Sequence, residues 1–482
     1  MRVLYLGNQG GLVNSRFYAE IAGHLLERGW PKGTVLTWTS DEAATLEEES
    51  GRCVAAQSFE RFVATRMMDT REGRIANDFP DVNWSSIWSV ERSFCDYSML
   101  EGYTGHRIEP RSYVELLTLR AGHFVGKALD DCDVLVCQKP DTLITYLALE
   151  LAKHRKIPRR VVCPAWILPE GQAGGYWAHD EFTRAPELAR TRWASLDLSS
   201  DSRLTARATG LQQALLDFGG TSSWHKLAPG RVDGRALVSP KIIKLTRYLS
   251  EQANLDEEVV YTKIDPARKT RATVTRLVRR ITTARCLQTI AASSIPERSI
   301  YFPLHMQPEY STLVQGMWTN NQIALIENLS RSMPLGYTLI VKEHPAARGR
   351  RPRSQYSYLK KMPNVELCDA PTSEILEKVQ ACVVISGTTG LEALARGVPV
   401  MMVGRSFYED AVGVVRRDTP SDFHSGLQET LRMRFKRDCI RENLLRFLSA
   451  YDSLLVRNFP SSPFGAEWAA GLESSLAMSP DS

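Results

Sequence analysis

Residues Tyr301 to Tyr408 contain three short polar segments, each of which follows an apolar run. They are Phe302-Pro-Leu-His-Met-Gln-Pro-Glu309, Val341-Lys-Glu-His-Pro345 and Ile385-Ser-Gly-Thr-Thr-Gly-Leu-Glu-Ala-Leu394. Each segment lies at the end of an apolar run that predicts a buried strand. Because open α/β sheets bind their ligands outside the carboxyl ends of the strands, the three segments predict one binding site at one edge of a sheet.

The third segment predicts a turn between a strand and a helix. Residues 382–385 form a short apolar run, and residues 391–396 are good helix formers. Such a turn directs backbone N–H groups and a helix N-terminus outward, so its natural ligand is a phosphate. The residues that would bind the phosphate are Ser386, Gly387, Thr388 and Thr389. The alternative is structural, with a threonine capping the helix and the glycines easing the turn.

The other two segments bring further polar groups to the same edge. The residues concerned are Gln307 and Glu309 after the predicted strand 299–303, and Lys342, His344 and Pro345 at the end of the predicted strand 336–342. The proline stops the strand and fixes the exit of the loop. Three polar strand ends within one stretch favour a ligand site over packing alone.

The three motifs resemble those of the bacterial capsule and surface polysaccharide biosynthesis proteins. These are glycosyltransferases of the two-domain GT-B architecture, related to the capsule Kdo transferases. The resemblance is specific over residues 298–410 and weaker over 85–170. It implies that the His-Pro motif and the Ser/Thr-rich turn bind the nucleotide of an activated sugar donor, a CMP-sugar in several members. The matching residues here are His344, Pro345, Ser386, Thr388 and Thr389.

Glu392 lies six residues after Ser386, in the first turn of the predicted helix. Related folds place an acid there, where its carboxylate can accept hydrogen bonds from ribose hydroxyls. The alternative is a favourable negative charge at a helix N-terminus.

Length and alternation of elements predict the domain organisation. A chain of 482 residues exceeds what one core usually supports. We expect an α/β fold, GT-B-like, with two doubly wound Rossmann-type domains facing a cleft and a helical insertion. The predicted parts are an acceptor domain (1–180), a mostly helical insertion or linker (181–297), a nucleotide-sugar-binding domain (298–460), and a C-terminal helix that crosses back, with a tail (461–482).

Composition indicates a cytoplasmic protein. The nine cysteines include no CxxC pair, which favours reduced thiols over disulfides or a zinc site. No apolar run approaches the length of a membrane span, and the N-terminus has no signal peptide. No DxD-type motif stands at a strand end, so we expect a metal-independent enzyme without a cofactor beyond its nucleotide-sugar substrate.

A transferase of this fold needs one carboxylate from the acceptor domain, as a base or a nucleophile. Asp96 is the first candidate and Glu91 the second, because both lie between an apolar lead-in and a predicted helix. The alternative is that both are solvated surface charges or pair with Arg92.

A basic segment at 267–286 carries seven lysines and arginines and no acid. Its apolar residues recur with helical spacing, so it predicts an amphipathic basic helix. The segment could pack as a surface helix, contact anionic lipid headgroups at the inner face of the membrane or a phosphorylated lipid acceptor, or bind RNA. The absence of stacking aromatics argues against nucleic acid.

The sequence thus predicts a glycosyltransferase that moves a sugar from a nucleotide donor to a capsule, surface polysaccharide or glycolipid acceptor. Two alternatives use the same donor site: a CDP-glycerol-type polymer transferase and a nucleotide-sugar 2-epimerase. A third alternative is a non-catalytic binding component of capsule assembly.

Overall fold

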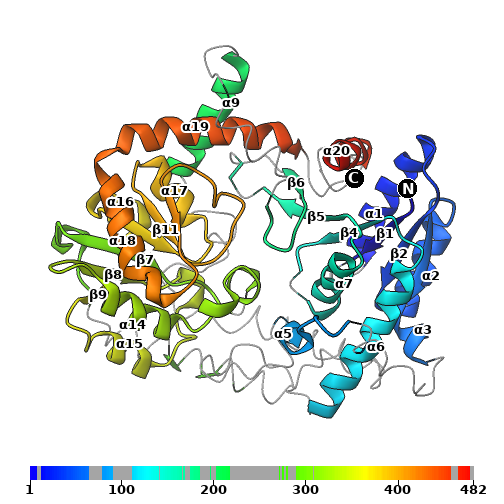
Figure 1. Cartoon of the computed structure of the whole chain (residues 1–482), viewed down its shortest axis with the longest axis horizontal. Coiled ribbons are helices and arrows are strands. Elements are labelled where there is room, and N and C mark those ends of the chain that lie inside the picture. Colours follow the sequence, from blue (N-terminus) through cyan, green and yellow to red (C-terminus); the bar gives the residue numbers. More distant parts are fainter. Residues whose placement is uncertain are drawn as a thin grey trace, which may run out of the picture.

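The computed structural model shows two α/β domains side by side (Figure 1). The residues that it describes are 1–7, 12–64, 77, 79–88, 90, 111–140, 142–165, 167–168, 174–184, 196, 202–217, 271, 274–275, 278–279, 289–307, 309–457 and 465–477.

The first domain is built on a seven-stranded sheet in the order β13-β6-β5-β4-β1-β2-β3. The strands are β1 (Val3–Leu6), β2 (Gly33–Thr37), β3 (Val54–Ser58), β4 (Val134–Gln138), β5 (Arg159–Pro164), β6 (Gly174–Ala178) and β13 (Val456–Arg457). The five strands from β3 to β5 are parallel, whereas β6 and β13 add an antiparallel edge. Strand residues 134–137 are apolar and fully buried, as expected of a parallel sheet that is covered on both faces.

Helices cover both faces of this sheet. On one side lie α1 (Leu12–Glu27), α2 (Ser40–Ser50) and α20 (Gly465–Ala477). On the other side lie α3 (Phe59–Ala64), α5 (Trp84–Trp88), α6 (Arg111–Leu129) and α7 (Leu143–His154).

The second domain is built on a six-stranded parallel sheet in the order β12-β11-β10-β7-β8-β9. The strands are β7 (Ser299–Pro303), β8 (Thr338–Lys342), β9 (Val365–Leu367), β10 (Ala381–Val384), β11 (Val400–Met402) and β12 (Val414–Arg416). Numbered within the domain, the order is 3-2-1-4-5-6, that of a doubly wound dinucleotide-binding sheet. The strand order reverses between β7 and β10, and folds of this kind bind their ligands at such a switch point.

This second sheet is also covered on both faces. One face packs on α14 (Gln322–Ser332), α15 (Arg353–Leu359) and α18 (Phe423–Arg432), and the other on α16 (Thr372–Lys378), α17 (Thr389–Ala395), α19 (Arg437–Leu454) and α9 (Ser202–Asp217). Short turns complete the domain: η4 (Ala292–Ser294), α13 (Tyr310–Leu313), η5 (Met317–Thr319), η6 (Pro345–Ala347), η7 (Pro420–Asp422) and η8 (Met433–Phe435). Two doubly wound sheets confirm the expected fold class.

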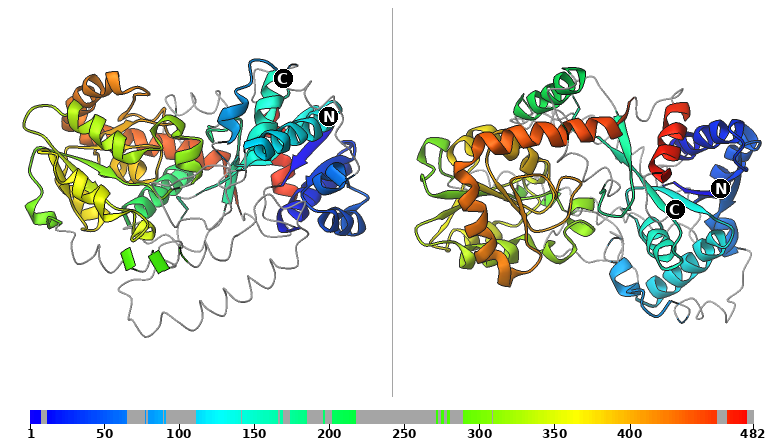
Figure 2. Two further views of the ribbon diagram at one scale, coloured as in Figure 1. Left: turned by 90° about the horizontal axis from the view of Figure 1, so that it is seen from below. Right: turned by 45° about the horizontal axis from the view of Figure 1, so that its top comes forward.

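The chain returns to the first domain at its end. Figure 2 shows α19 running from the second domain toward the first, where β13 pairs with β6. Helix α20 then packs on α1 with Trp468 fully buried. The backbone oxygen of Trp468 accepts a hydrogen bond from Trp177 Nε1 at 3.1 Å. The Trp468 ring meets the Phe17 ring edge-on, with 5.5 Å between the ring centroids.

Several sequence predictions lie outside the described residues. Glu91 and Asp96 fall there, as does most of the basic segment 267–286. Within that segment Val274 and Val278 are helical and more than half exposed. No helix in the described part of the chain combines the length and the apolar character needed to cross a membrane.

Candidate functional site

The three predicted segments meet at one edge of the second sheet. They follow β7, β8 and β10, and β7 is the neighbour of both other strands. All three strands are parallel, so the loops after them emerge at the same end of the sheet. The loops after β7 and β10 flank the switch point, and the loop after β8 lies beside them.

His305 ties the first loop to the third. Its backbone N–H donates to Gln322 Oε1 at 2.6 Å, and its Nε2 accepts from the backbone N–H of Ile385 at 3.4 Å. Burial, together with the nearby His344 and Arg351, lowers the pKa of His305 to about 3. The imidazole is therefore neutral at physiological pH, and it fixes the spacing of the two loops.

The absence of a side chain at Gly387 leaves room for the imidazole of His305. A Cβ at position 387 would lie 2.8 Å from His305 Cε1, closer than packed carbon atoms approach. The glycine therefore allows the turn after β10 to contact the imidazole face. The hydroxyl of Tyr408 donates to the Gly387 carbonyl at 2.5 Å and holds the turn from the other side.

Substituting Gly387→Ala is therefore expected to destabilise the protein by about 1–3 kcal/mol through overpacking. Urea unfolding measures this change. Gly210→Ala is the matched control, because a Cβ at this exposed position in α9 meets nothing within 4 Å. The control is expected to be neutral or slightly stabilising, since alanine favours a helix over glycine. A Gly387→Ala protein as stable as wild type would contradict the role assigned to this contact.

Gln307 and Glu309 both support the loop after β7. Gln307 is buried, its Nε2 donates to the Asn320 carbonyl, and its Oε1 accepts from Arg351 at 3.5 Å. Glu309 precedes α13, and its backbone N–H donates to Thr312 Oγ1 at 3.2 Å. These contacts give Gln307 a positioning role that the sequence did not predict.

The loop after β8 is organised around Glu343. Its carboxylate accepts from Arg351 Nε at 2.8 Å, from Tyr356 Oη at 2.5 Å and from the backbone N–H of His344 at 2.8 Å. His344 caps η6, which Pro345 opens, and His344 Nδ1 accepts from the Ala346 N–H at 3.2 Å. Because Nδ1 accepts, the ring proton of neutral His344 is on Nε2.

The turn after β10 carries the predicted phosphate ligands. Ser386 is buried, and its Oγ donates to the Ser311 carbonyl at 3.3 Å. Thr388 and Thr389 are half-buried and stand at the N-cap and the first residue of α17. The threonines therefore occupy the helix start that both interpretations of this turn require.

Lys342 and Glu392 lie beneath the loops. Lys342 is 9% exposed and its Nζ donates to Thr372 Oγ1 at 3.1 Å. Glu392 is 3% exposed, and its Oε2 accepts no hydrogen bond from the described residues. Burial raises the pKa of Glu392 to about 7, against the opposing charges of Arg396 and Lys342. Glu392 is thus a buried carboxyl that can still accept a hydrogen bond.

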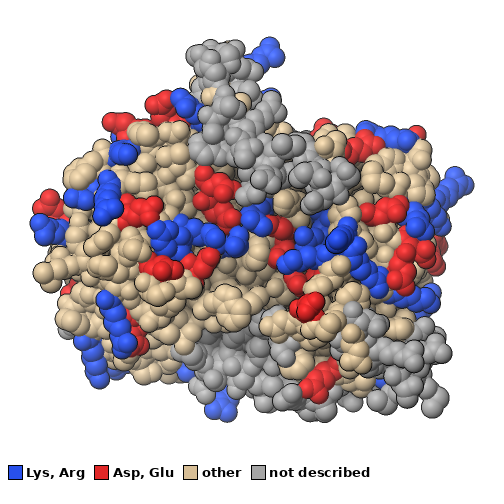
Figure 3. All heavy atoms as spheres, viewed as in Figure 1, with Lys and Arg blue, Asp and Glu red and all other residues tan. Residues whose placement is uncertain are grey.

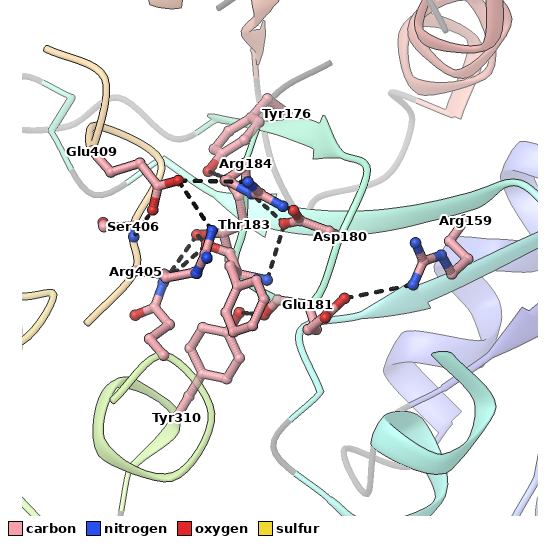
Figure 4. Close-up of polar contacts among 12 residues, drawn as sticks. Arg159, Tyr176, Asp180, Glu181, Thr183, Arg184, Tyr310, Arg405, Ser406 and Glu409 are labelled. Carbon is pink, nitrogen blue, oxygen red and sulfur yellow. Dashed lines mark hydrogen bonds and ion pairs between the residues drawn. The ribbon is translucent and has the colours of Figure 1, made fainter. Parts of the chain in front are cut away.

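A contact between the domains was not predicted from the sequence (Figure 4). The loop 179–184 after β6 packs against the second domain, where Tyr310 Oη donates to the Glu181 carbonyl and Gln315 Nε2 to the Phe182 carbonyl at 3.2 Å. Thr183 adopts a φ of 66°, which strains a β-branched residue. The chain that follows the loop after β7 is therefore also held by contacts with the first domain.

Charged side chains complete this contact. Arg184 pairs with Asp180 in its own loop and lies 3.5 Å from Glu409 of the second domain, while Arg405 lies 3.6 Å from the same carboxylate. Burial raises the pKa of Glu409, and both arginines oppose the rise. Figure 3 shows lysines and arginines, with acids among them, across the middle of the face where the domains meet. The only sequence signal was the domain boundary expected near residue 180.

Part of the chain is similar to a family of known sequences. Residues 246–442 match the sequence model of a family described as capsule polysaccharide biosynthesis protein. The match confirms the resemblance that the three motifs predicted, and it contains all of them. No protein among the curated sequences matches the chain.

Solved structures resemble the chain weakly. The beta Kdo 2,4 transferase KpsC of Thermosulfurimonas dismutans is 12% identical, over 67% of this chain and 80% of that one, with a TM-score of 0.31. The UDP-GlcNAc 2-epimerase of Neisseria meningitidis, bound to UDP-GlcNAc, is 11% identical over 99% and 100%, with a TM-score of 0.22. That of Methanocaldococcus jannaschii, with UDP-GlcNAc and UDP, is 10% identical over 98% and 100%, with a TM-score of 0.27. Such TM-scores support no argument, so the fold assignment rests on the two sheets.

Proposed function

Because residues 246–442 match the capsule polysaccharide biosynthesis family, we propose that the protein is a glycosyltransferase. It takes a sugar from a nucleotide donor, for which a CMP-sugar is the first candidate, and transfers it to a saccharide or lipid-linked acceptor of a capsule or surface polysaccharide. The observation that carries the proposal is the convergence of three polar loops at the switch point of the second sheet.

The donor lies across these loops. Its phosphate is bound by the turn from Ser386 to Gly390, through backbone N–H groups and hydroxyls. Its base and ribose lie near His344 and Pro345, and a ribose hydroxyl donates to the Glu392 oxygen that accepts no hydrogen bond from the described residues. A buried acceptor of this kind is costly without a partner, so the donor would stabilise it.

His344 is favoured over Lys342 as the group that offsets charge on the leaving phosphate. Both lie at the end of β8, but the Lys342 ammonium is buried and donates to Thr372. His344 is half-buried and carries its ring proton on Nε2 when neutral. A hydrogen-bond donor at that position stabilises negative charge as it develops on the phosphate in the transition state.

The acceptor side is assigned to the first domain. Asp96, or failing it Glu91, deprotonates the incoming hydroxyl or acts as the nucleophile. The segment 267–286 is proposed to contact the membrane when the acceptor is lipid-linked, because its arginines and lysines favour anionic headgroups.

Incubation with CMP-, CDP-, UDP- and GDP-sugars and with CDP-glycerol, each with and without capsular oligosaccharide or glycolipid acceptors, tests this function. A transferase releases nucleotide and extends the acceptor only when both substrates are present. An epimerase converts its donor without any acceptor, a glycerol polymer transferase uses CDP-glycerol instead of a sugar donor, and a binding component releases no nucleotide. Each of the last three outcomes would replace the proposed reaction.

A further inference from the structure

Trp318 is far more exposed than the other tryptophans that the structure describes. It is 84% exposed, whereas the others in the described ranges are buried or half-buried. An indole left in water forgoes the large hydrophobic stabilisation that its burial would give. Exposed tryptophans are typical of binding surfaces, where one face of the ring awaits a partner.

The backbone that carries Trp318 is held firmly. The residue is the middle one of η5, which follows Gly316, and a Cβ on that glycine would clash with Ile385 Cγ2. Thr319 Oγ1 donates to the Gly316 carbonyl at 3.1 Å, and its backbone N–H donates to the same oxygen at 2.8 Å. The Asn320 carbonyl accepts from Gln307 Nε2. The indole is therefore displayed by a fixed turn, and little order would have to be gained on binding.

The η5 turn also lies beside the first domain and beside the end of the second sheet at which the three loops meet. Two residues, at most about 7 Å of backbone, separate Trp318 from Gly316, which packs on the residue that precedes Ser386. Gln315, on the other side of Gly316, donates to Phe182 of the first domain. In Figure 1 the lime-green segment that contains α13 and η5 lies on the side of the second domain that faces the first.

We propose that Trp318 is a stacking platform for a sugar ring of the acceptor. The inference rests on the proposed function, in which an acceptor saccharide must approach the donor edge from the first domain. One face of a pyranose ring presents C–H groups that pack on an indole, while its hydroxyls stay in water. A single exposed indole suits this amphipathic ligand. The half-buried Asn320 and the exposed Asn321 offer amide groups nearby for its hydroxyls.

The test compares wild type with Trp318→Ala, Trp318→Phe and the control Phe435→Ala. Phe435 is a matched control because it is 80% exposed and lies on a different turn of the same domain. Each protein is titrated with short oligosaccharides from partially hydrolysed bacterial capsular polysaccharides and, separately, with CMP, CDP, UDP and GDP. Trp318→Ala should weaken saccharide binding about tenfold, as expected for the loss of one aromatic stacking contact. Trp318→Phe should retain most of the affinity, and Phe435→Ala all of it.

The nucleotide series separates this inference from the proposed function. Nucleotide dissociation constants that match wild type in Trp318→Ala, together with weakened saccharide binding, support the acceptor platform. Unchanged saccharide binding in Trp318→Ala overturns it, as does a wild type that binds nucleotide but no saccharide. Loss of nucleotide binding would instead assign the indole to the donor base, and a changed molar mass in light scattering would assign it to a contact between copies of the chain. If wild type binds saccharide through Trp318 but binds no nucleotide, the proposed donor site is wrong and the saccharide platform stands.

Discussion

His344→Ala is expected to weaken donor binding about 10- to 100-fold and to reduce transfer at least as much. The magnitude is that of a lost hydrogen bond to a charged phosphate. The substitution also removes the acceptor for the Ala346 N–H, 3.2 Å from His344 Nδ1. Loss of this cap should cost about 1 kcal/mol of stability, measurable by urea unfolding.

His344→Asn separates the two roles. An asparagine is a good helix cap and can accept a hydrogen bond from the Ala346 N–H. It does not, however, place a hydrogen-bond donor at the position of His344 Nε2. We therefore expect the asparagine variant to keep wild-type stability and to lose donor binding as the alanine variant does. Steady-state kinetics with donor and acceptor, measured beside unfolding, give both readouts. An asparagine variant with wild-type kinetics would show that His344 only caps η6.

Glu392→Gln is expected to stabilise the protein by up to about 3 kcal/mol at pH 8 and to have little effect at pH 5. Burial raises the pKa of Glu392 from 4.5 to about 7. The native state then holds a proton that the unfolded state has released, so the stability contributed by this group falls as pH rises from about 4.5 through 7. A shift of this size corresponds to about 3 kcal/mol. Glutamine keeps the shape of the side chain and cannot ionise.

The variant must be compared with wild type at each pH, because the ionisation of His305 changes the stability of the protein with the opposite pH dependence. Its pKa of about 3 lies below the usual value, so its contribution is lost as pH falls below 6.5. Urea unfolding at pH 5 and pH 8 gives the difference, and Glu366→Gln serves as control because Glu366 is exposed on β9 of the same sheet. Equal stabilities of Glu392→Gln and wild type at pH 8 would contradict the claim that ionisation of the buried Glu392 destabilises the native state.

Local patterns in the sequence predicted the parts of the second domain that matter most. Apolar runs of strand length, each followed by helix formers, predicted β7, β8 and β10 and placed the polar segments at their ends. The order β8-β7-β10, which brings those ends together, depends on pairing between distant strands and follows only from general rules for such sheets. The antiparallel edge, in which Val456 pairs with Gly175, has no local signal at all.

Side-chain direction was less predictable than position. Gln307 follows a strand as a ligand-binding residue would, yet its amide joins Asn320 to Arg351. Nothing in the residues after β7 distinguishes a group that faces a ligand from one that supports a neighbouring loop. The ion pair of Arg184 with Glu409 joins parts of the chain that are far apart in sequence. This partner of Arg184 could not be inferred without the folded structure.

Calorimetric titration of wild type with CMP, CDP, UDP and GDP tests the claim that the loops after β7, β8 and β10 bind the nucleotide of a sugar donor. We predict that one of these nucleotides, with CMP as the first candidate, binds as a single molecule per chain and binds about 10- to 100-fold more weakly to His344→Asn. Failure of all four to bind wild type, or equal binding to wild type and His344→Asn, would contradict the claim.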